Sequence, residues 1–113
     1  MINYRKRIDK LLVVYKGAGI KVHFVPRSKL ADYGGMNDEA AKKLGFRRLP
    51  DDTILIDRKM KLKDQYEALL HEAEEMVRME KLHKAYWPEH VEALRAEKHG
   101  LSPFVKRELA RGI

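Results

Sequence analysis

Apolar residues near the N-terminus recur first at helical and then at alternating spacing. The helical set, at i, i+3, i+4 and i+7, consists of Ile8, Leu11, Leu12 and Tyr15. It predicts one face of a helix, for which Gly17 offers a left-handed stop. Residues 20–25 then alternate apolar and polar side chains and end at Pro26, which is typical of a half-buried strand with His23 on its polar face.

The middle of the chain predicts shorter elements. Residues 30–35 are compatible with a short strand followed by a turn at the glycines, after which Asn37 can cap a small helix that runs through Leu44 and stops at Gly45. Residues 50–52 mark another turn. The run at residues 53–57 is rich in β-branched and apolar side chains, which predicts a well-buried strand.

A long amphipathic helix is predicted from about residue 64 to about residue 84, without internal glycine or proline. Its apolar stripe consists of Leu69, Leu70, Ala73, Met76 and Val77. Pro88 breaks this pattern. Residues 89–98 predict a further helix with Val91 and Leu94 as its apolar positions, closed by His99 and Gly100.

The C-terminal segment begins with a helix-start signal. Ser102 is a good N-cap, and Pro103 fits the first helical position. The apolar residues of this last short helix are Phe104, Val105, Leu109 and Ala110. The element order predicts an α+β fold in a single domain over residues 1–113, with an N-terminal helix, a short sheet of two or three strands, a long helix and two short C-terminal helices.

Composition supports a folded chain and removes several kinds of chemistry. Hydrophobic residues make up 44% and charged residues 36%, which suffices for a core beneath a charged surface. The chain has no cysteine, which excludes disulfides, thiolate catalysis and cysteine-based zinc sites. Any metal must therefore bind to His, Asp or Glu.

No apolar run approaches the length of a membrane span, and the N-terminus lacks the apolar core of a signal peptide, so we expect a cytoplasmic protein without a membrane partner. Only three residues carry side-chain amides, namely Asn3, Asn37 and Gln65. Few amides among many charges is the bias of thermophile proteins.

The segment that carries candidate chemistry is residues 71–75, on the long predicted helix. His71 and Glu75 are four residues apart, so both can reach one metal ion, while Glu72 projects toward a water bound to that ion. Two histidines and one glutamate form an accepted zinc ligand set, so a second histidine must come from elsewhere.

His90 is the favoured second histidine. His83 lies on the same helix as His71, roughly 18 Å along its axis, and is excluded. The break at Pro88 lets the next helix fold back and bring His90 beside His71 and Glu75. Glu97, on the same face as His90, can orient an imidazole nitrogen or act as a fourth ligand.

A structural alternative exists for the same residues. On a helical wheel, His71 and Glu75 lie roughly opposite the apolar stripe, which also fits an ordinary solvated face with Glu74 and Arg78 as an ion pair. A helix that borders a cleft has the same amphipathic pattern, so the wheel does not separate the two interpretations.

The strand at residues 53–57, followed by the helix segment at residues 66–76, resembles the minimal zincin core of metallopeptidases related to the phage-repressor-cleaving protein of integrative elements (the ImmA/IrrE-like family). The segment also looks like phage and archaeal proteins that combine a His-Glu-x-x-Glu helix with a later helix bearing His and Glu. Zincins have a histidine where this chain has Glu75.

The resemblance implies a zinc-dependent peptidase of a virus or mobile element. His71 and His90 would be metal ligands, Glu75 the carboxylate ligand and Glu72 the general base. A peptide or protein substrate would then lie along an edge strand near residues 34–35.

The competing function is a non-enzymatic viral or mobile-element module with a degenerate or purely structural site. The formal charge of +7 favours acidic partners. The basic residues available for a nucleic acid or a protein partner are Arg5, Lys6, Arg7, Lys10, Arg47, Arg48, Lys61 and Lys63. Since no base-reading motif is visible, any nucleic-acid binding is predicted to be weak and salt-sensitive.

Overall fold

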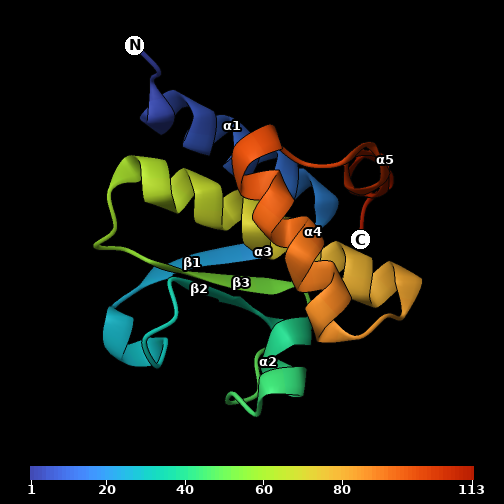
Figure 1. Ribbon diagram of the computed structural model, residues 1–113. Helices are drawn as coiled ribbons and strands as arrows, with labels where there is room; N and C mark the ends of the chain where they lie inside the picture. Colours follow the sequence, from blue (N-terminus) through green and yellow to red (C-terminus); the bar gives the residue numbers. More distant parts are fainter.

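The computed structural model describes residues 1–113 and has an α+β fold, as the sequence predicts (Figure 1). The helices are α1 (Tyr4–Ala18), α2 (Asp38–Leu44), α3 (Leu62–Leu82), α4 (Tyr86–His99) and α5 (Pro103–Arg111). The strands are β1 (Lys21–Val25), β2 (Gly35–Asn37) and β3 (Thr53–Asp57), with a short 3-10 turn, η1, at Arg27–Lys29.

The three strands form one mixed sheet in the order β1-β3-β2. Strand β3 is central and buried along its whole length, as its apolar run predicts. It pairs in parallel with β1 and antiparallel with β2, in which Gly35 lies opposite Ile56 and Asn37 opposite Ile54. One side of β2 therefore remains a free edge, and this edge borders the candidate site described below.

The side chains of β3 separate two apolar clusters, because successive residues of a strand point to opposite faces. Ile54 and Ile56 pack with α1, α3 and α5, whereas Leu55 packs with apolar residues around α2. Figure 1 shows α1 and α3 on one side of the sheet and α4 crossing α3. A buried hydrogen bond of 2.8 Å from the Tyr15 hydroxyl to the Leu69 carbonyl holds α1 against α3.

Helix α1 ends later than predicted. Its face of Ile8 and Tyr15 is fully buried, but the helix continues through Gly17 to Ala18. The left-handed C-cap is Gly19, with φ of 94°. Ala18 is buried in the core, and this packing favours the additional helical residues over a stop at Gly17.

The predicted strand at residues 30–35 is wrong, while the helix after it is confirmed. Ala31 and Asp32 have positive φ, which interrupts an extended chain, so the strand forms only at β2, after the turn. Asn37 caps α2 by accepting a hydrogen bond from the Ala40 N–H at 2.9 Å, and Gly45 ends the helix in the left-handed conformation.

The chain reverses earlier than Pro88. Helix α3 ends at Leu82, His83 adopts a left-handed conformation with φ of 53°, and α4 begins at Tyr86. Pro88 therefore lies inside the first turn of α4, where a missing N–H costs no helical hydrogen bond. The reversal itself, on which the position of His90 depends, is as predicted.

The apolar positions of α4 do not face the core. Val91 and Leu94 are 55% and 49% exposed, whereas Glu89, Ala93 and Ala96 are buried. The inner face of this helix thus combines small and polar residues, a pattern that apolar periodicity does not detect. The last helix is confirmed, since Ser102 caps α5 and Val105 is buried.

None of the five helices is both long enough and apolar enough to cross a membrane.

Candidate metal centre

Helix α3 is buried on all sides along its central part. Every residue from Leu69 to Val77 is buried, including His71, Glu72, Glu74 and Glu75. The interpretation of residues 71–75 as a solvated face is therefore wrong. Their partners come from β2, from α4 and from the start of α5: Asn37 bonds to Glu72, Glu97 to His71, His90 to Glu75 and Ser102 to Glu74.

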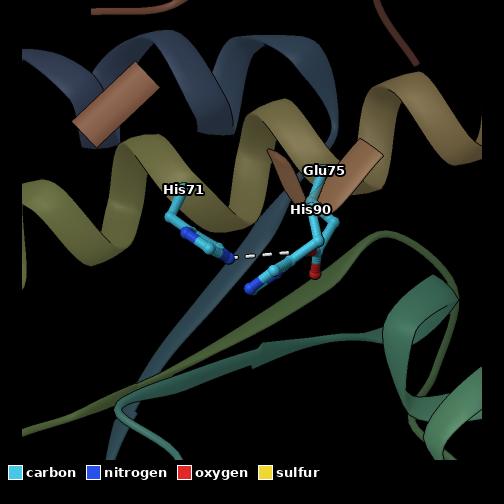
Figure 2. Close-up of side chains that lie close together, drawn as sticks. All are labelled: His71, Glu75 and His90. Atoms are coloured by element: carbon cyan, nitrogen blue, oxygen red, sulfur yellow. Dashed lines mark hydrogen bonds and ion pairs between the residues drawn. The ribbon is translucent and has the colours of Figure 1, made fainter. Parts of the chain in front are cut away.

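The three predicted metal ligands converge. His71 and Glu75 come from α3, His90 comes from α4, and their side chains point toward one another (Figure 2). One potential ligand atom from each residue lies within 4.8 Å of those of the other two, so the group could hold a metal ion. The geometry thus agrees with the convergence that the predicted fold-back of the chain implies.

The ligand atoms of the group lie close enough together to hold one metal ion. The His71 Nε2 and Glu75 Oε2 atoms are 3.4 Å apart. Two ligands that each bind zinc at about 2 Å in tetrahedral geometry are separated by roughly 3.3 Å. His90 Nδ1 lies 2.7 Å from the same Glu75 oxygen and shares a hydrogen bond with it. The donor set is two imidazoles and one carboxylate, which zinc accepts.

Two neighbours orient the imidazole rings. Glu97 Oε2 lies 2.6 Å from His71 Nδ1, which leaves His71 Nε2 directed at Glu75. Tyr86 stacks on the His90 ring with the centroids 5.1 Å apart, and its hydroxyl lies 3.1 Å from His90 Nδ1. Of the two roles considered for Glu97, this geometry matches the orienting partner of a ligand histidine.

Asn37 connects β2 to the acidic side of the site. Its Nδ2 donates hydrogen bonds to Glu72 Oε1 at 2.9 Å and to Glu75 Oε1 at 3.1 Å. Because its Oδ1 caps α2 at the same time, the side chain is fixed at both ends. Asn37 therefore fixes the two carboxylates relative to each other and to the sheet.

Gly35 allows the close approach of β2 and Glu72. A Cβ atom at Gly35 would lie 3.1 Å from both Glu72 Cγ and Glu72 Oε2, and 3.2 Å from the Leu55 carbonyl oxygen. Contacts this short are tighter than most Cβ contacts, so Glu72 or the strand would have to shift by a few tenths of an ångström. The absence of a side chain at residue 35 thus lets Glu72 lie directly against the edge strand.

The electrostatic surroundings of the site stabilise cationic and disfavour anionic groups. Burial lowers the pKa of His71, but its hydrogen bond with Glu75 and the charge of Glu72 more than offset this and raise the pKa to about 9. Burial raises the pKa of Glu72 to about 8, although the charge of His71 and the hydrogen bond from Asn37 lower it. A buried site with this excess of carboxylates attracts a cation.

A cavity of about 320 Å³ opens over the group and is lined by His71, Glu72, Glu75, His90 and Glu97. Gly34 and Gly35 form part of its wall, so the edge strand borders the same space. The other histidines take no part in the ligand group: His23 is exposed on β1, His83 follows the last residue of α3, and His99 is the last residue of α4.

Sequence reasoning missed three residues of the site. Asn37 was predicted only as a helix cap, and its second role depends on β2 lying beside α3. Residues 34–35 were predicted only to border a bound peptide, because the contact of Gly35 with Glu72 joins segments that are distant in the sequence. Tyr86 was not predicted. The one hint was the position of Tyr86, four residues before His90 at the start of the predicted fold-back.

A second buried polar group fixes α4 and α5 against α3. The Glu74 carboxylate accepts hydrogen bonds from Ser102 N–H at 2.8 Å and Ser102 Oγ at 2.6 Å. Arg78 pairs with both Glu74 and Glu89. The predicted ion pair between Glu74 and Arg78 is present but buried, and it supports the element that carries His90.

Comparisons with models of protein families, with curated proteins and with solved structures gave no match.

Proposed function

We propose that the protein is a zinc-dependent peptidase with a zincin-like site, in which His71, Glu75 and His90 hold the metal. The observation that carries this proposal is the convergence of the three side chains from two helices inside a cavity. A structural site needs no such opening, whereas a catalytic site keeps one position accessible to water or substrate.

Glu72 is positioned for proton transfer. It comes from the same helix as His71 and Glu75, lines the cavity and is held by Asn37. Bound zinc would supply the acidity of a coordinated water and polarise the peptide carbonyl. Glu72 accepts a proton from the attacking water and passes it to the leaving nitrogen. The C–O bond forms, the C–N bond breaks, and a carboxylate and an amine result.

The free edge of β2 provides a place for the peptide backbone. An extended peptide can add to an open strand edge through main-chain hydrogen bonds. Gly34 and Gly35 leave this part of the edge without side chains, and both line the cavity. A peptide bound there lies between β2 and the ligands on α3.

The test uses protein purified without an affinity tag and loaded with one equivalent of zinc. A degenerate library of end-blocked decapeptides is incubated with it, and new termini are identified by mass spectrometry. We expect cleavage that a chelator abolishes and that added zinc restores. Glu72→Gln should retain zinc and lose cleavage by roughly a hundredfold or more.

Glu92→Gln serves as the matched control on α4 and should cleave normally, because Glu92 is half-buried outside the cavity and pairs with Arg95. A protein that binds one zinc per chain and cleaves no peptide would contradict the peptidase proposal. In that case the metal has a structural role, and the basic residues named in the sequence analysis remain as candidates for contact with a nucleic acid or a protein partner.

A further inference from the structure

The cavity differs sharply in charge from the rest of the molecule. The chain carries a formal charge of +7, yet no lysine or arginine lines the cavity. Its walls carry the carboxyl groups of Asp64, Glu67, Glu72, Glu75 and Glu97, against the one cationic imidazole of His71. A cleft with an excess of one sign of charge concentrates ligands of the opposite sign. The cavity is thus unsuited to phosphate groups and suited to cationic ones.

Two of these carboxylates stand apart from the metal centre. Asp64 and Glu67 lie on the first two turns of α3, seven and four residues before His71, and share its face of the helix. Neither forms an ion pair. A metal would leave their charge uncompensated, because it binds about 6 to 10 Å further along the helix.

The opposite end of the cavity is apolar. Met36, Ala40 and Leu44 come from β2 and α2, and Tyr86 comes from the start of α4. Figure 1 shows α2 and the start of α4 at the same end of the molecule, away from the start of α3. The metal centre lies between an acidic end and an apolar end of one continuous cavity.

Building on the proposed function, we infer that the substrate is a cationic peptide segment. A lysine or arginine two or three residues from the scissile bond lies against Asp64 and Glu67, since an extended residue spans about 3.3 Å. A large apolar side chain on the other side of the bond occupies the space between α2 and Tyr86. The charge and the apolar wall together define the substrate class.

The inference can be tested by binding. Four end-blocked heptapeptides of alanine carry lysine or glutamine at the second position and leucine or glycine at the fifth, and each is also made in reverse order. Trp87, the only tryptophan of the chain, lies 5.9 Å from the His90 ring and reports binding through its fluorescence. Zinc-loaded Glu72→Gln is used so that no peptide is consumed.

In one of the two orders, we expect the lysine and leucine peptide to bind about tenfold more tightly than either peptide that lacks one of these residues. The lysine advantage should shrink between about 20 mM and about 0.5 M salt, because exposed charges are screened. When Asp64→Asn and Glu67→Gln are added to the Glu72→Gln protein, the preference for lysine should disappear. The control pair Asp9→Asn with Glu108→Gln changes the net charge equally outside the cavity and should preserve it.

Three results would overturn the inference. The first is equal affinity for the lysine and glutamine peptides, and the second is no binding of any of them. The third is a lysine preference that survives Asp64→Asn with Glu67→Gln. Its failure is distinguishable from that of the proposed function. Wild-type cleavage without a lysine preference contradicts only the substrate class. Lysine-selective binding without cleavage contradicts only the peptidase proposal.

Discussion

Glu74 and Glu75 are neighbours on α3 and equally buried, yet their surroundings differ completely. The Glu74 carboxylate is satisfied by Arg78 and by the N–H and hydroxyl of Ser102, and it lies away from the metal cavity. Glu75 faces two imidazoles and an amide inside that cavity. The partners of a buried carboxylate thus distinguish a structural role, as for Glu74, from a candidate metal-binding role, as for Glu75.

The largest effect is expected from Glu74→Ala. Removing this carboxylate leaves the Ser102 N–H and hydroxyl without a partner and leaves Arg78 with Glu89 alone, so the free energy of unfolding should fall by about 3 kcal/mol. Chemical denaturation of the metal-free protein measures this change. The zinc affinity of the molecules that remain folded should be close to that of the wild type. A Glu74→Ala protein that is as stable as the wild type but no longer binds zinc would show that Glu74 contributes to the metal site and not to the fold.

Glu97→Gln tests the orienting role of the hydrogen bond to His71. Loss of a charged partner of a ligand histidine typically lowers metal affinity by about 10- to 100-fold. Competition with a zinc chelator gives the affinity, and Glu92→Gln on the same helix is the control. A stoichiometric loss of the metal would show instead that Glu97 is a ligand.

Gly35→Ala probes the contact between the edge strand and Glu72. The added methyl group would meet Glu72 and the Leu55 carbonyl, so we expect a loss of about 2 kcal/mol in the free energy of unfolding. Gly34→Ala is the matched control, because its Cβ would be no closer than 3.4 Å to Met60 Sδ. Equal stabilities of the two variants would show that the close approach at Gly35 is unimportant.

Glu80 represents a third kind of carboxylate on α3, one whose neighbours are also acidic. Burial and the adjacent Asp52 and Asp38 raise its pKa to about 7, while the charge of Lys81 lowers it. The folded state therefore retains this proton after the unfolded chain, with a pKa near 4.5, has released it. Stability should fall between about pH 4.5 and 7 and then stay level.

Glu80→Gln should remove this contribution. We expect the variant to match the wild type at about pH 4 and to be about 1 kcal/mol more stable at about pH 8, a small value because water screens the partly exposed group. Denaturation curves at both pH values measure the difference. Asp51→Asn, on the exposed turn before β3, is the control. A destabilised Glu80→Gln at high pH would mean that the ionised carboxylate is required for folding.

Sequence patterns predicted those elements well whose residues are either uniformly buried or act within a few residues of one another. The buried run at residues 53–57 and the cap at Asn37 needed no long-range information. Val91 and Leu94 misled, because the inner face of α4 is occupied by Ala93, Ala96 and polar groups. The spacing of large apolar residues therefore does not identify the buried face of a helix that packs through small and polar side chains.

The candidate site was predictable to the extent that helix geometry determines it. The spacing of His71 and Glu75, together with the reversal before α4, leads to His90 and Glu97. The roles of Asn37 and Gly35 were not predictable, because both residues reach the site through the position of β2 beside α3. That contact depends on tertiary structure and leaves no periodic trace in the sequence. The stacking of Tyr86 on His90 is a local contact, four residues apart on α4, and was overlooked.

The central claim, that His71, Glu75 and His90 hold one zinc ion, is tested most directly by anomalous diffraction at the zinc edge from crystals of the zinc-loaded, untagged protein. One strong peak is predicted at about 2 Å from a ligand atom of each of the three residues, with Glu97 still hydrogen-bonded to His71. The absence of a peak, or a peak bound by other residues, would contradict the claim.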